Sequence, residues 1–454
     1  MSNPHAIVTP MVLGLGVVAA PMALAVEPFN PLVQPDRFQV TEFATGLNFP
    51  LGMTTLPDGS VLVATTVKTT PAGQFYSVDG RGQILRFTDV NNDGIADGAG
   101  QVVADNLPGG LTGLERRGDL VFATSSEPGK EAIHVFTPGV AASDPLVAVK
   151  TLDFDFPTGT LHSSNALATR DKPGSPGVVE VFFNVASAFD NVDSTDPVGL
   201  SDGDGLNASL DADSVYSLAV ELDTSGPTPT ANVSDVTKIA AGLRNASGLA
   251  FVPDTGDLYL VDNAINNPKS REELNVVPAG DLGSVVPDFG FADDYTLIDG
   301  TVVNPGGSSI DQPISTLVTD DDEIAISPVD IAVASDPFAD ILGEGLFIGF
   351  HGDFNGAGLD NETNPVGFYS LVDGEFIEFI GDDLAGIGHP DGLLIDGEHL
   401  YISDLNDGSL FGGPRNGAIY RVTALPATVV PTPSAAAMTL VMAGVGLLRR
   451  SARH

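Results

Sequence analysis

A unit of strand, turn and strand recurs six times along the chain. Each copy starts with small or proline residues, continues as an apolar strand, turns at Gly and Asp, and returns as a second apolar strand. A third apolar strand follows each copy, at a spacing that varies with loop length. The copies begin at Phe49, Leu111, Ser164, Ala246, Pro328 and Pro390, and the third strands at Gly82, Ala132, Asp213, Glu273, Gly367 and Gly417. Self-similarity of this kind is typical of repeat architectures.

The repeats predict an all-β protein, because the strands are short, Gly (52) and Pro (33) are dense, and helical periodicity is almost absent. One unit cannot bury both of its faces alone. Six matched copies therefore predict a six-bladed β-propeller over residues 36–424, in preference to a pair of β-sandwiches. We expect the last strands to complete a blade begun near the N-terminus, since that closure removes a free sheet edge.

The composition limits the possible partners. The chain carries 60 Asp and Glu against 19 Lys and Arg, a formal net charge of −41, which repels nucleic acid and anionic lipid. Calcium or a neutral small molecule suits this surface better. The absence of Cys excludes a thiolate metal site or nucleophile. The sequence also lacks an HExxH, a P-loop and a GxSxG motif, so it gives no indication of a metalloprotease, a nucleotide-driven enzyme or a serine hydrolase.

The two ends of the chain predict export. Residues 1–25 combine a short apolar run with an Ala-Leu-Ala sequence, a pattern typical of a signal peptide. Residues 425–454 combine a Val-Pro-Thr-Pro break, an apolar segment and a basic end, so the protein would contact the membrane only there. This order resembles the PEP-CTERM sorting signal of Gram-negative and related bacteria, which implies processing by exosortase-type machinery at the cell envelope. An ordinary membrane anchor is the alternative.

A short acidic loop predicts a structural calcium site. Asp89, Asn91, Asp93 and Asp97 alternate along it, and Gly94 permits a sharp turn. Alternating oxygen ligands with Gly at the sixth position begin a calcium loop, although the Glu of an EF-hand is missing at the twelfth position. An Asx-rich hairpin turn without a cation is the alternative interpretation.

His162 is a candidate general base. It stands just before the first strand of the third repeat, where a propeller side chain can face the axial opening. A neutral imidazole there could accept a proton from a hydroxyl group. A histidine with a purely structural role is the alternative.

Several segments resemble the glucose/sorbosone dehydrogenase family, the soluble PQQ-dependent type of sugar dehydrogenase. Arg244 and Asn245 in GLRNASGLAF match the start of its Arg-Asn-x-x-Gly-Leu strand, and residues 266–280 match its acidic segment ending in Leu-Asn. PDGSVLVAT at Pro57 and GAIYRV at Gly417 match its first and last blades. The resemblance implies a six-bladed propeller that oxidises a sugar with PQQ and calcium.

The same resemblance implies roles for individual residues. His162 falls where the family carries its catalytic base, Arg244 would stabilise charge on the reduced cofactor, and Asn245 would hydrogen-bond to it. Main-chain carbonyls of Asn267 and Pro268 would hold the calcium ion that polarises PQQ.

Two functional hypotheses follow. The first is an exported PQQ- and calcium-dependent oxidoreductase acting on a sugar or related alcohol. The second is a non-catalytic propeller that binds carbohydrate or protein, because residues 272–414 contain no Lys or Arg to pair with the three carboxylates of PQQ and carry His351 and His389 in the matching regions. A propeller hydrolase with axial calcium is a third class, for which no set of axial carboxylates can be assigned.

Overall fold

The structure is a computed structural model. It describes residues 29–426 except 69–79, 128, 142–143, 158–159, 161, 163–165, 191, 193, 266–270, 293–294, 297–301, 304–310, 318–326, 353–362, 382–387 and 406–416. Within this part of the chain, no helix has the length and apolar character needed to cross a membrane.

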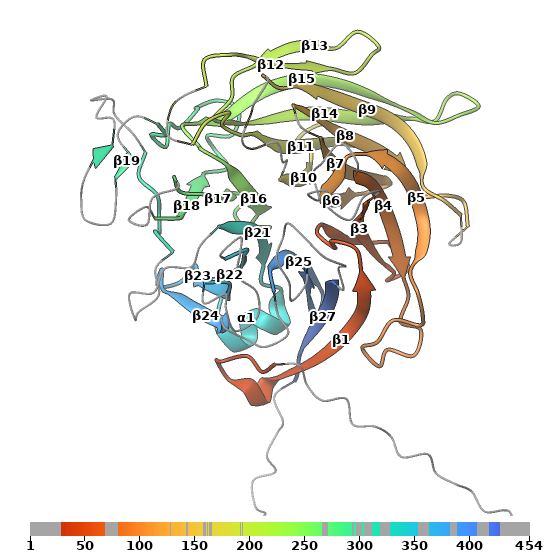
Figure 1. The fold of residues 1–454 in the computed structure, drawn as a ribbon, viewed down its shortest axis with the longest axis vertical. Coiled ribbons are helices and arrows are strands. Elements are labelled where there is room, and N and C mark those ends of the chain that lie inside the picture. Colours follow the sequence, from red (N-terminus) through yellow and green to blue (C-terminus); the bar gives the residue numbers. More distant parts are fainter. Residues whose placement is uncertain are drawn as a thin grey trace, which may run out of the picture.

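Six antiparallel sheets are arranged as blades around an axis (Figure 1). Each innermost strand contacts the innermost strand of the next blade, and the last contacts the first, so the ring is closed. The innermost strands, from blade 1 to blade 6, are β2 (Met53–Thr55), β6 (Gly110–Arg117), β10 (Leu167–Asp171), β16 (Ala246–Phe251), β21 (Pro328–Val333) and β25 (Pro390–Asp396). This arrangement confirms the predicted six-bladed β-propeller.

The second and third strands of every predicted repeat are also present. The second strands are β3 (Val61–Lys68), β7 (Leu120–Glu127), β11 (Val178–Val185), β17 (Leu258–Asp262), β22 (Gly345–Phe350) and β26 (His399–Asp404). The third strands are β4 (Gly80–Phe87), β8 (Lys130–Thr137), β14 (Ser214–Asp223), β18 (Glu273–Val277), β23 (Val366–Ser370) and β27 (Gly417–Ala424). Fourth strands are β5 (Gln101–Pro108), β9 (Val147–Asp155), β15 (Thr230–Ala241) and β24 (Phe376–Ile380).

The N-terminal strand closes the ring, as the sequence predicts. β1 (Phe38–Leu47) follows the short 3-10 helix η1 (Pro35–Arg37) and pairs antiparallel with β27, with Val40 opposite Val422. Blade 6 is therefore built from both ends of the propeller. Because β1 covers the edge of β27, this pairing ties the two ends of the ring together.

One hairpin leaves its own blade. β12 (Val198–Ser201) and β13 (Asn207–Leu210) lie between β11 and β14 of blade 3, yet β12 pairs with β9 of blade 2. The hairpin buries Val198, Leu200 and Leu210 in the hydrophobic core between these blades. Burial of these apolar side chains explains the crossing.

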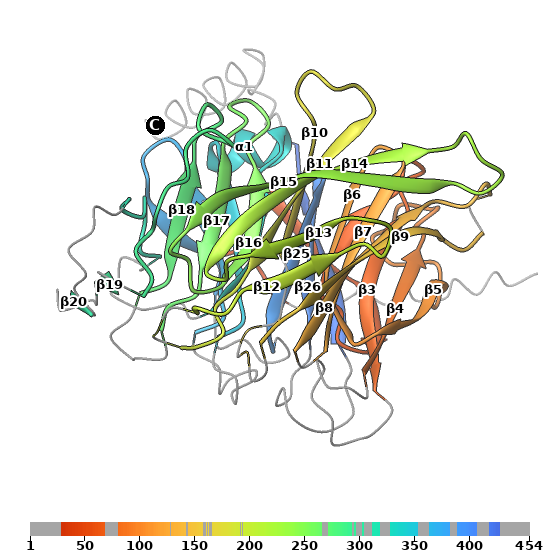
Figure 2. The ribbon, with the colours of Figure 1, turned by 90° about the horizontal axis from the view of Figure 1, so that it is seen from above.

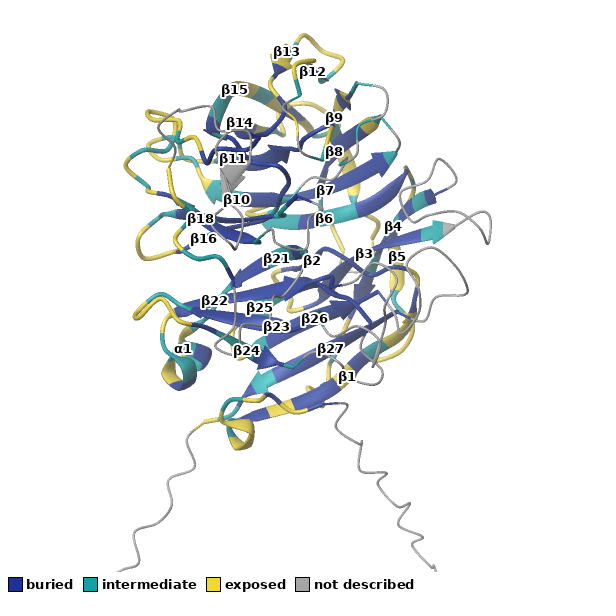
Figure 3. Ribbon diagram, turned by 60° about the vertical axis from the view of Figure 1, so that its left-hand side comes forward, coloured by how far each residue is buried: buried dark blue, intermediate teal, exposed yellow. Residues whose placement is uncertain are grey.

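Small elements decorate the ring. Helix α1 (Asp336–Leu342) connects β21 to β22 and buries Phe338 and Ile341, and the short strands β19 (Tyr295–Thr296) and β20 (Val302–Val303) pair with each other. Most residues of the blade strands are buried, and Figure 3 colours these strands dark blue. Phe residues supply much of this packing, for example Phe347 against Phe368 and Phe379.

The direction of the strands positions the candidate site. All six innermost strands occupy equivalent places in the ring, so their first residues gather at one end of the axis, together with the last residues of the second strands. We call this the upper end of the ring. Figure 2 shows the blades from the side, with the long β14–β15 hairpin extending outward. Innermost strands approach closely, since a Cβ on Gly392 would lie 2.2 Å from Leu51 O.

Candidate functional site at the upper end of the ring

His162 lies at the upper end, just before β10 of blade 3. Its Nδ1 is 3.1 Å from the carbonyl oxygen of Ser187. A carbonyl oxygen only accepts hydrogen bonds, so Nδ1 carries the hydrogen and Nε2 is the lone-pair nitrogen of the neutral ring. The imidazole is thus held in the tautomer that a proton acceptor requires.

The surroundings of His162 keep it neutral. Burial lowers its pKa to about 4, and the positive charge of Arg244 acts in the same direction, while the Ser187 carbonyl and Asp190 oppose the shift. The imidazole is therefore unprotonated at neutral pH. A base with so low a pKa is ready to accept a proton but gains little driving force from doing so.

Arg244 lies next to His162 and precedes β16 of blade 4. Its Nη2 donates to Asp190 Oδ1 at 2.6 Å, and its Nε donates to the Asp190 carbonyl at 3.0 Å. The Ser187 amide donates to the Arg244 carbonyl at 2.8 Å, so one residue contacts both His162 and Arg244. The Arg244 side chain is 8% exposed and that of Asp190 is 35% exposed, so a buried guanidinium pairs with a carboxylate that solvent partly reaches.

Asn245 extends the polar site across three blades. Its Oδ1 accepts from Asn184 Nδ2 of blade 3 at 3.4 Å, and its Nδ2 donates to Asn263 Oδ1 at 2.8 Å. Asn263 in turn donates from Nδ2 to the carbonyl of Pro328, where β21 of blade 5 begins, at 2.6 Å. The structure therefore brings together the three residues that the sequence singled out, His162, Arg244 and Asn245.

A buried carboxylate holds the start of β16. Asp262, the last residue of β17, accepts from the backbone amides of Arg244 at 2.9 Å and Asn245 at 2.6 Å. Burial raises the pKa of Asp262 to about 7 despite these hydrogen bonds. Two hydrogen bonds to backbone amides fix the direction in which the Arg244 and Asn245 side chains leave the main chain.

Two further carboxyl groups lie beside Asp262. Glu272 accepts from the amides of Ala264 at 2.6 Å and Ser327 at 3.0 Å, and burial raises its pKa to about 7. Burial, followed by the charge of Asp262, raises the pKa of Glu273 to about 8. Near neutral pH these raised pKa values keep the three carboxyl groups partly or largely protonated, so this part of the site presents hydrogen-bonding carboxyl groups and less than their full negative charge.

The predicted calcium loop is closed by its own hydrogen bonds and by one arginine. Asp89 accepts from the amides of Asp93 at 3.1 Å and Gly94 at 2.9 Å, and it pairs with Arg421 Nη1 at 2.9 Å. Asp97 accepts from the amide of Val90 at 2.6 Å, and Asn91 donates to Asp93 at 2.9 Å.

Calcium binding at this loop stays a prediction. Across the described ranges, no cluster of three or more His, Asp or Glu has the arrangement of a metal site. The other predicted calcium ligands, Asn267 and Pro268, lie outside the described residues.

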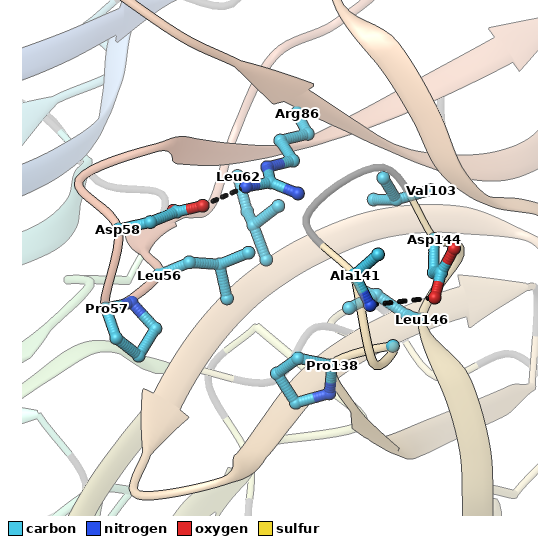
Figure 4. A pocket seen from close by; sticks show the side chains of 11 residues that line it. Leu56, Pro57, Asp58, Leu62, Arg86, Val103, Pro138, Ala141, Asp144 and Leu146 are labelled. Atoms are coloured by element: carbon cyan, nitrogen blue, oxygen red, sulfur yellow. Dashed lines mark hydrogen bonds and ion pairs between the residues drawn. The ribbon is translucent and has the colours of Figure 1, made fainter.

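A separate pocket lies at the opposite end of the ring, between blades 1 and 2 (Figure 4). It measures about 180 Å³ and has an apolar floor that includes Leu62, Val103 and Leu146. Its guanidinium, Arg86, bonds to Asp58 and donates to Ser60 Oγ at 2.8 Å. The pocket shares no residue with the upper site, and its cation is neutralised locally.

Sequence reasoning missed the residues that organise the site. Ser187 and Asp190 follow β11 without any motif, so nothing in the sequence pairs them with His162 and Arg244. Asp262 had a usable signal, since the equivalent strand of blade 6 also ends in Asp, at Asp404. A carboxylate repeated at the end of the second strand indicates that it accepts hydrogen bonds from backbone amides in both blades.

These observations define the class: a six-bladed β-propeller with a polar site at one end of its axis. No protein-family model matches the chain, and no curated protein matches its sequence. Among solved structures, an iodide structure of Carbohydrate-Active Enzymes Family AA12 from Trichoderma reesei is 16% identical, with a TM-score of 0.51, and the alignment covers 88% of this chain and 98% of that one. At this identity the likeness shows the fold alone.

Two further structures align with lower scores. The calcium structure of the same Trichoderma reesei family is 16% identical over 88% of this chain and 98% of that one, with a TM-score of 0.49. A putative oxidoreductase (glucose dehydrogenase) from Thermus thermophilus is 15% identical over 85% of this chain and 99% of that one, with a TM-score of 0.48.

Proposed function

We propose that the chain is an exported oxidoreductase that acts on a hydroxyl group of a sugar or related alcohol at the upper end of the ring. One observation carries this proposal. His162 of the third repeat and the Arg244–Asn245 pair of the fourth match the glucose/sorbosone dehydrogenase pattern. Ser187 contacts both His162 and Arg244, and the imidazole is in a neutral, proton-accepting tautomer. The name of the Trichoderma reesei propeller, which places it among carbohydrate-active enzymes, supports the same substrate class.

In this proposal each residue has one task. His162 Nε2 takes the proton of the substrate hydroxyl as the C–H bond is oxidised. Arg244, held by Asp190 and Asp262, presents a guanidinium to the negative charge that develops. Asn245, fixed between Asn184 and Asn263, positions a hydrogen-bonding group beside it.

The residues fit a quinone cofactor only in part. When bound, a quinone such as PQQ would supply the two-electron acceptor, and calcium would polarise it. Arg244 and Asn245 are the residues that would contact it. Beyond Glu272, however, the first described Lys or Arg is Arg421, which pairs with Asp89, and Arg415 lies outside the described residues. Arg244 thus fits one anionic group of PQQ, and the described residues between 272 and 414 include no Lys or Arg for its other carboxylates.

The test is reduction of an artificial electron-acceptor dye by recombinant protein with PQQ, calcium chloride and a panel of aldoses and alcohols. We expect turnover that requires PQQ in excess over protein, because the described residues between 272 and 414 supply no Lys or Arg to pair with the carboxylates of the cofactor. The absence of dye reduction with every sugar, together with an unchanged absorption spectrum of added PQQ, would reject the proposal.

A non-catalytic binding module is the second candidate. The observation that favours it is the acidic character of the site, where Asp262, Glu272 and Glu273 are buried beside an arginine that already has a carboxylate partner. Amide, imidazole and carboxylate groups suit the hydroxyl groups of a neutral glycan. Hits on a glycan array without dye reduction would support this candidate, and dye reduction without hits would exclude it.

We also propose export and exosortase-type processing of the tail. Residues 1–25 and most of residues 425–454 lie outside the described residues, so the proposal rests on their sequence. Mass spectrometry of the protein from the cell envelope and medium of its host should find a mature form that starts near residue 26 and ends near the Val-Pro-Thr-Pro segment. An intact tail on every molecule would contradict the processing step.

A further inference from the structure

One exposed aromatic ring lies beside the candidate site at the upper end of the ring of blades. Phe189 follows β11 of blade 3 and is 51% exposed. The other phenylalanines of the described part of the chain are buried or partly buried. Phe189 therefore adds little to the hydrophobic core, and much of its phenyl surface is open to solvent.

The backbone of Phe189 is held in place. Its amide donates to Ser187 Oγ at 3.1 Å, and Ser187 Oγ donates in turn to the carbonyl oxygen of Phe189 at 2.7 Å. The two preceding residues, Ser187 and Ala188, are buried, at 0% and 4% exposure. Because these hydrogen bonds order the turn in the free protein, a ligand that meets the ring does not have to order the main chain.

The same segment carries the contacts that organise the candidate site. The carbonyl of Ser187 accepts from His162 Nδ1 at 3.1 Å, and Asp190 pairs with Arg244 at 2.6 Å. Phe189 lies between these two anchors, and adjacent Cα atoms are about 3.8 Å apart. Solvent reaches this side of the site, since Asp190 is 35% exposed and His162 is partly exposed. Phe189 is thus at the rim of the site, next to the residues that hold the imidazole and the guanidinium.

The surroundings of Phe189 suit a sugar better than a protein partner. In the described part of residues 186–194, the only other exposed apolar side chain is Val192, at 57%. A protein interface of ordinary size covers about 800 Å² on each partner, far more than a phenyl group and a valine provide. A pyranose, by contrast, has a face of C–H groups whose partial positive charge is attracted to the negative face of an aromatic ring. Its edge carries hydroxyl groups, which imidazole, guanidinium and amide groups bind.

We propose that Phe189 is the surface on which the pyranose ring of the substrate stacks, with the edge of the sugar and its hydroxyl groups directed to His162, Arg244 and Asn245. This role rests on the proposed function and narrows its substrate class to a sugar in ring form with an open C–H face, in preference to an open-chain alcohol. Phe189 binds and orients the sugar and takes no part in the transfer of protons or electrons. A contact made equally in the ground state and the transition state lowers KM and leaves kcat unchanged.

Steady-state dye reduction with PQQ, calcium and the best sugar of the panel tests this role in the wild type, Phe189→Ala and Phe189→Tyr. We expect Phe189→Ala to raise KM about tenfold and to leave kcat within about threefold, because it removes the aromatic contact alone. Phe189→Tyr keeps the aromatic face and should return KM to within about twofold of the wild type. Val372→Ala is the matched control, because Val372 is 73% exposed in the turn between β23 and β24, at the opposite end of the ring of blades.

A second readout does not depend on turnover. The chain has no Trp, so Phe189→Trp introduces its only indole. With calcium, and with or without PQQ, at least one of D-glucose, D-galactose, D-mannose and D-xylose should shift the emission of this variant to shorter wavelength, because a stacked sugar displaces water from the indole. D-sorbitol, an open-chain polyol, should leave the emission unchanged. Val372→Trp should show no sugar-dependent shift.

The outcomes separate the stacking role from the proposed function. An unchanged KM in a folded Phe189→Ala variant that oxidises sugar would overturn the stacking role and leave the proposed function standing. A loss confined to kcat would overturn it as well, since a contact that only binds acts on KM. No wild-type turnover with any sugar would overturn the proposed oxidation, and a sugar-dependent emission shift in Phe189→Trp would then still support the stacking site. With or without turnover, the absence of that shift for every sugar would reject the stacking site.

Discussion

The starts of blade 4 and blade 6 have the same backbone support and different side chains. Asp262 accepts from the amides of Arg244 and Asn245, and Asp404 accepts from the amides of Gly388 and His389 in the equivalent place. The carboxylate therefore belongs to the scaffold of the repeat. What differs is the pair of side chains that it presents, a cation and an amide in blade 4 against no side chain and an imidazole in blade 6. The proposed chemistry therefore depends on these side chains and not on the shared carboxylate.

Removing the imidazole of His162 should have the largest effect on activity. His162→Asn should lower kcat/KM by roughly 100-fold to 10,000-fold, the usual contribution of a general base. His134 is a matched control, since burial also lowers its pKa to about 4 but it bonds to Ser125 within blade 2. The measurement is kcat/KM for dye reduction between pH 3.5 and 8. Equal losses in His162→Asn and His134→Asn would show that both changes act through folding.

The two capping carboxylates should be about equally important for stability. Asp262→Ala and Asp404→Ala each leave two buried backbone amides without their side-chain acceptor, and an unmade hydrogen bond of this kind costs about 1–3 kcal/mol. Urea unfolding followed by circular dichroism measures the loss. The two variants should differ in dye-reduction activity, because Asp262 also fixes the direction of the Arg244 side chain. A stability loss in only one of the two variants would break the equivalence of blades 4 and 6.

The free energy of unfolding should fall as pH rises, and Glu273 of blade 4 should contribute to that fall. The pKa of Glu273 is about 8 in the folded protein against an ordinary value of 4.5. Between these values the folded state holds a proton that the unfolded state has released, so this contribution is present below pH 4.5 and lost as pH rises through about 8.

Thermal unfolding of Glu273→Gln tests this sign. The decrease in melting temperature between pH 5 and pH 8 should be smaller in Glu273→Gln than in the wild type. Glu221→Gln serves as the control, since that side chain is exposed on β14 and should leave the decrease unchanged. An identical decrease in all three proteins would show that Glu273 does not titrate in this range.

The smallest effect is expected at the acidic loop on blade 1. If calcium binds there, it should raise the melting temperature of the wild type, and Asp93→Ala should remove most of that rise. Because Arg421 and backbone amides already satisfy Asp89, we expect a shift of only a few degrees. The same calcium-dependent shift in both proteins would exclude this loop as the binding site.

The sequence predicts much of the fold because each blade is a local repeat. Turn residues and alternating apolar runs define the first three strands of each blade, and the pairing of β1 with β27 follows from the need to cover an edge. The β12–β13 hairpin could not be predicted, because its pairing with β9 depends on apolar contacts between blades. The local pattern of apolar and polar residues does not indicate with which sheet such a hairpin pairs.

The candidate site, like the fold, could be predicted only in part from the sequence. His162, Arg244 and Asn245 were found from their motif and their place before a strand. The sequence could not show that Ser187 and Asp190 contact these residues, or that His351 hydrogen-bonds to Asp391. These contacts join segments that are far apart in the sequence, and no spacing of residues predicts them. Histidines in the place of expected basic residues were visible, but the carboxylate that orients one of them was not.

The most direct test compares two arginine–aspartate pairs whose guanidinium groups are both buried. Arg244 pairs with Asp190 at the upper end, and Arg421 pairs with Asp89 on the outer part of blade 6. Dye-reduction turnover with PQQ, calcium and the best sugar should fall by about 100-fold or more in Arg244→Met, as when a transition-state donor is removed, and stay within threefold of the wild type in Arg421→Met. Equal turnover in the two folded variants would contradict a functional site at the upper end of the ring.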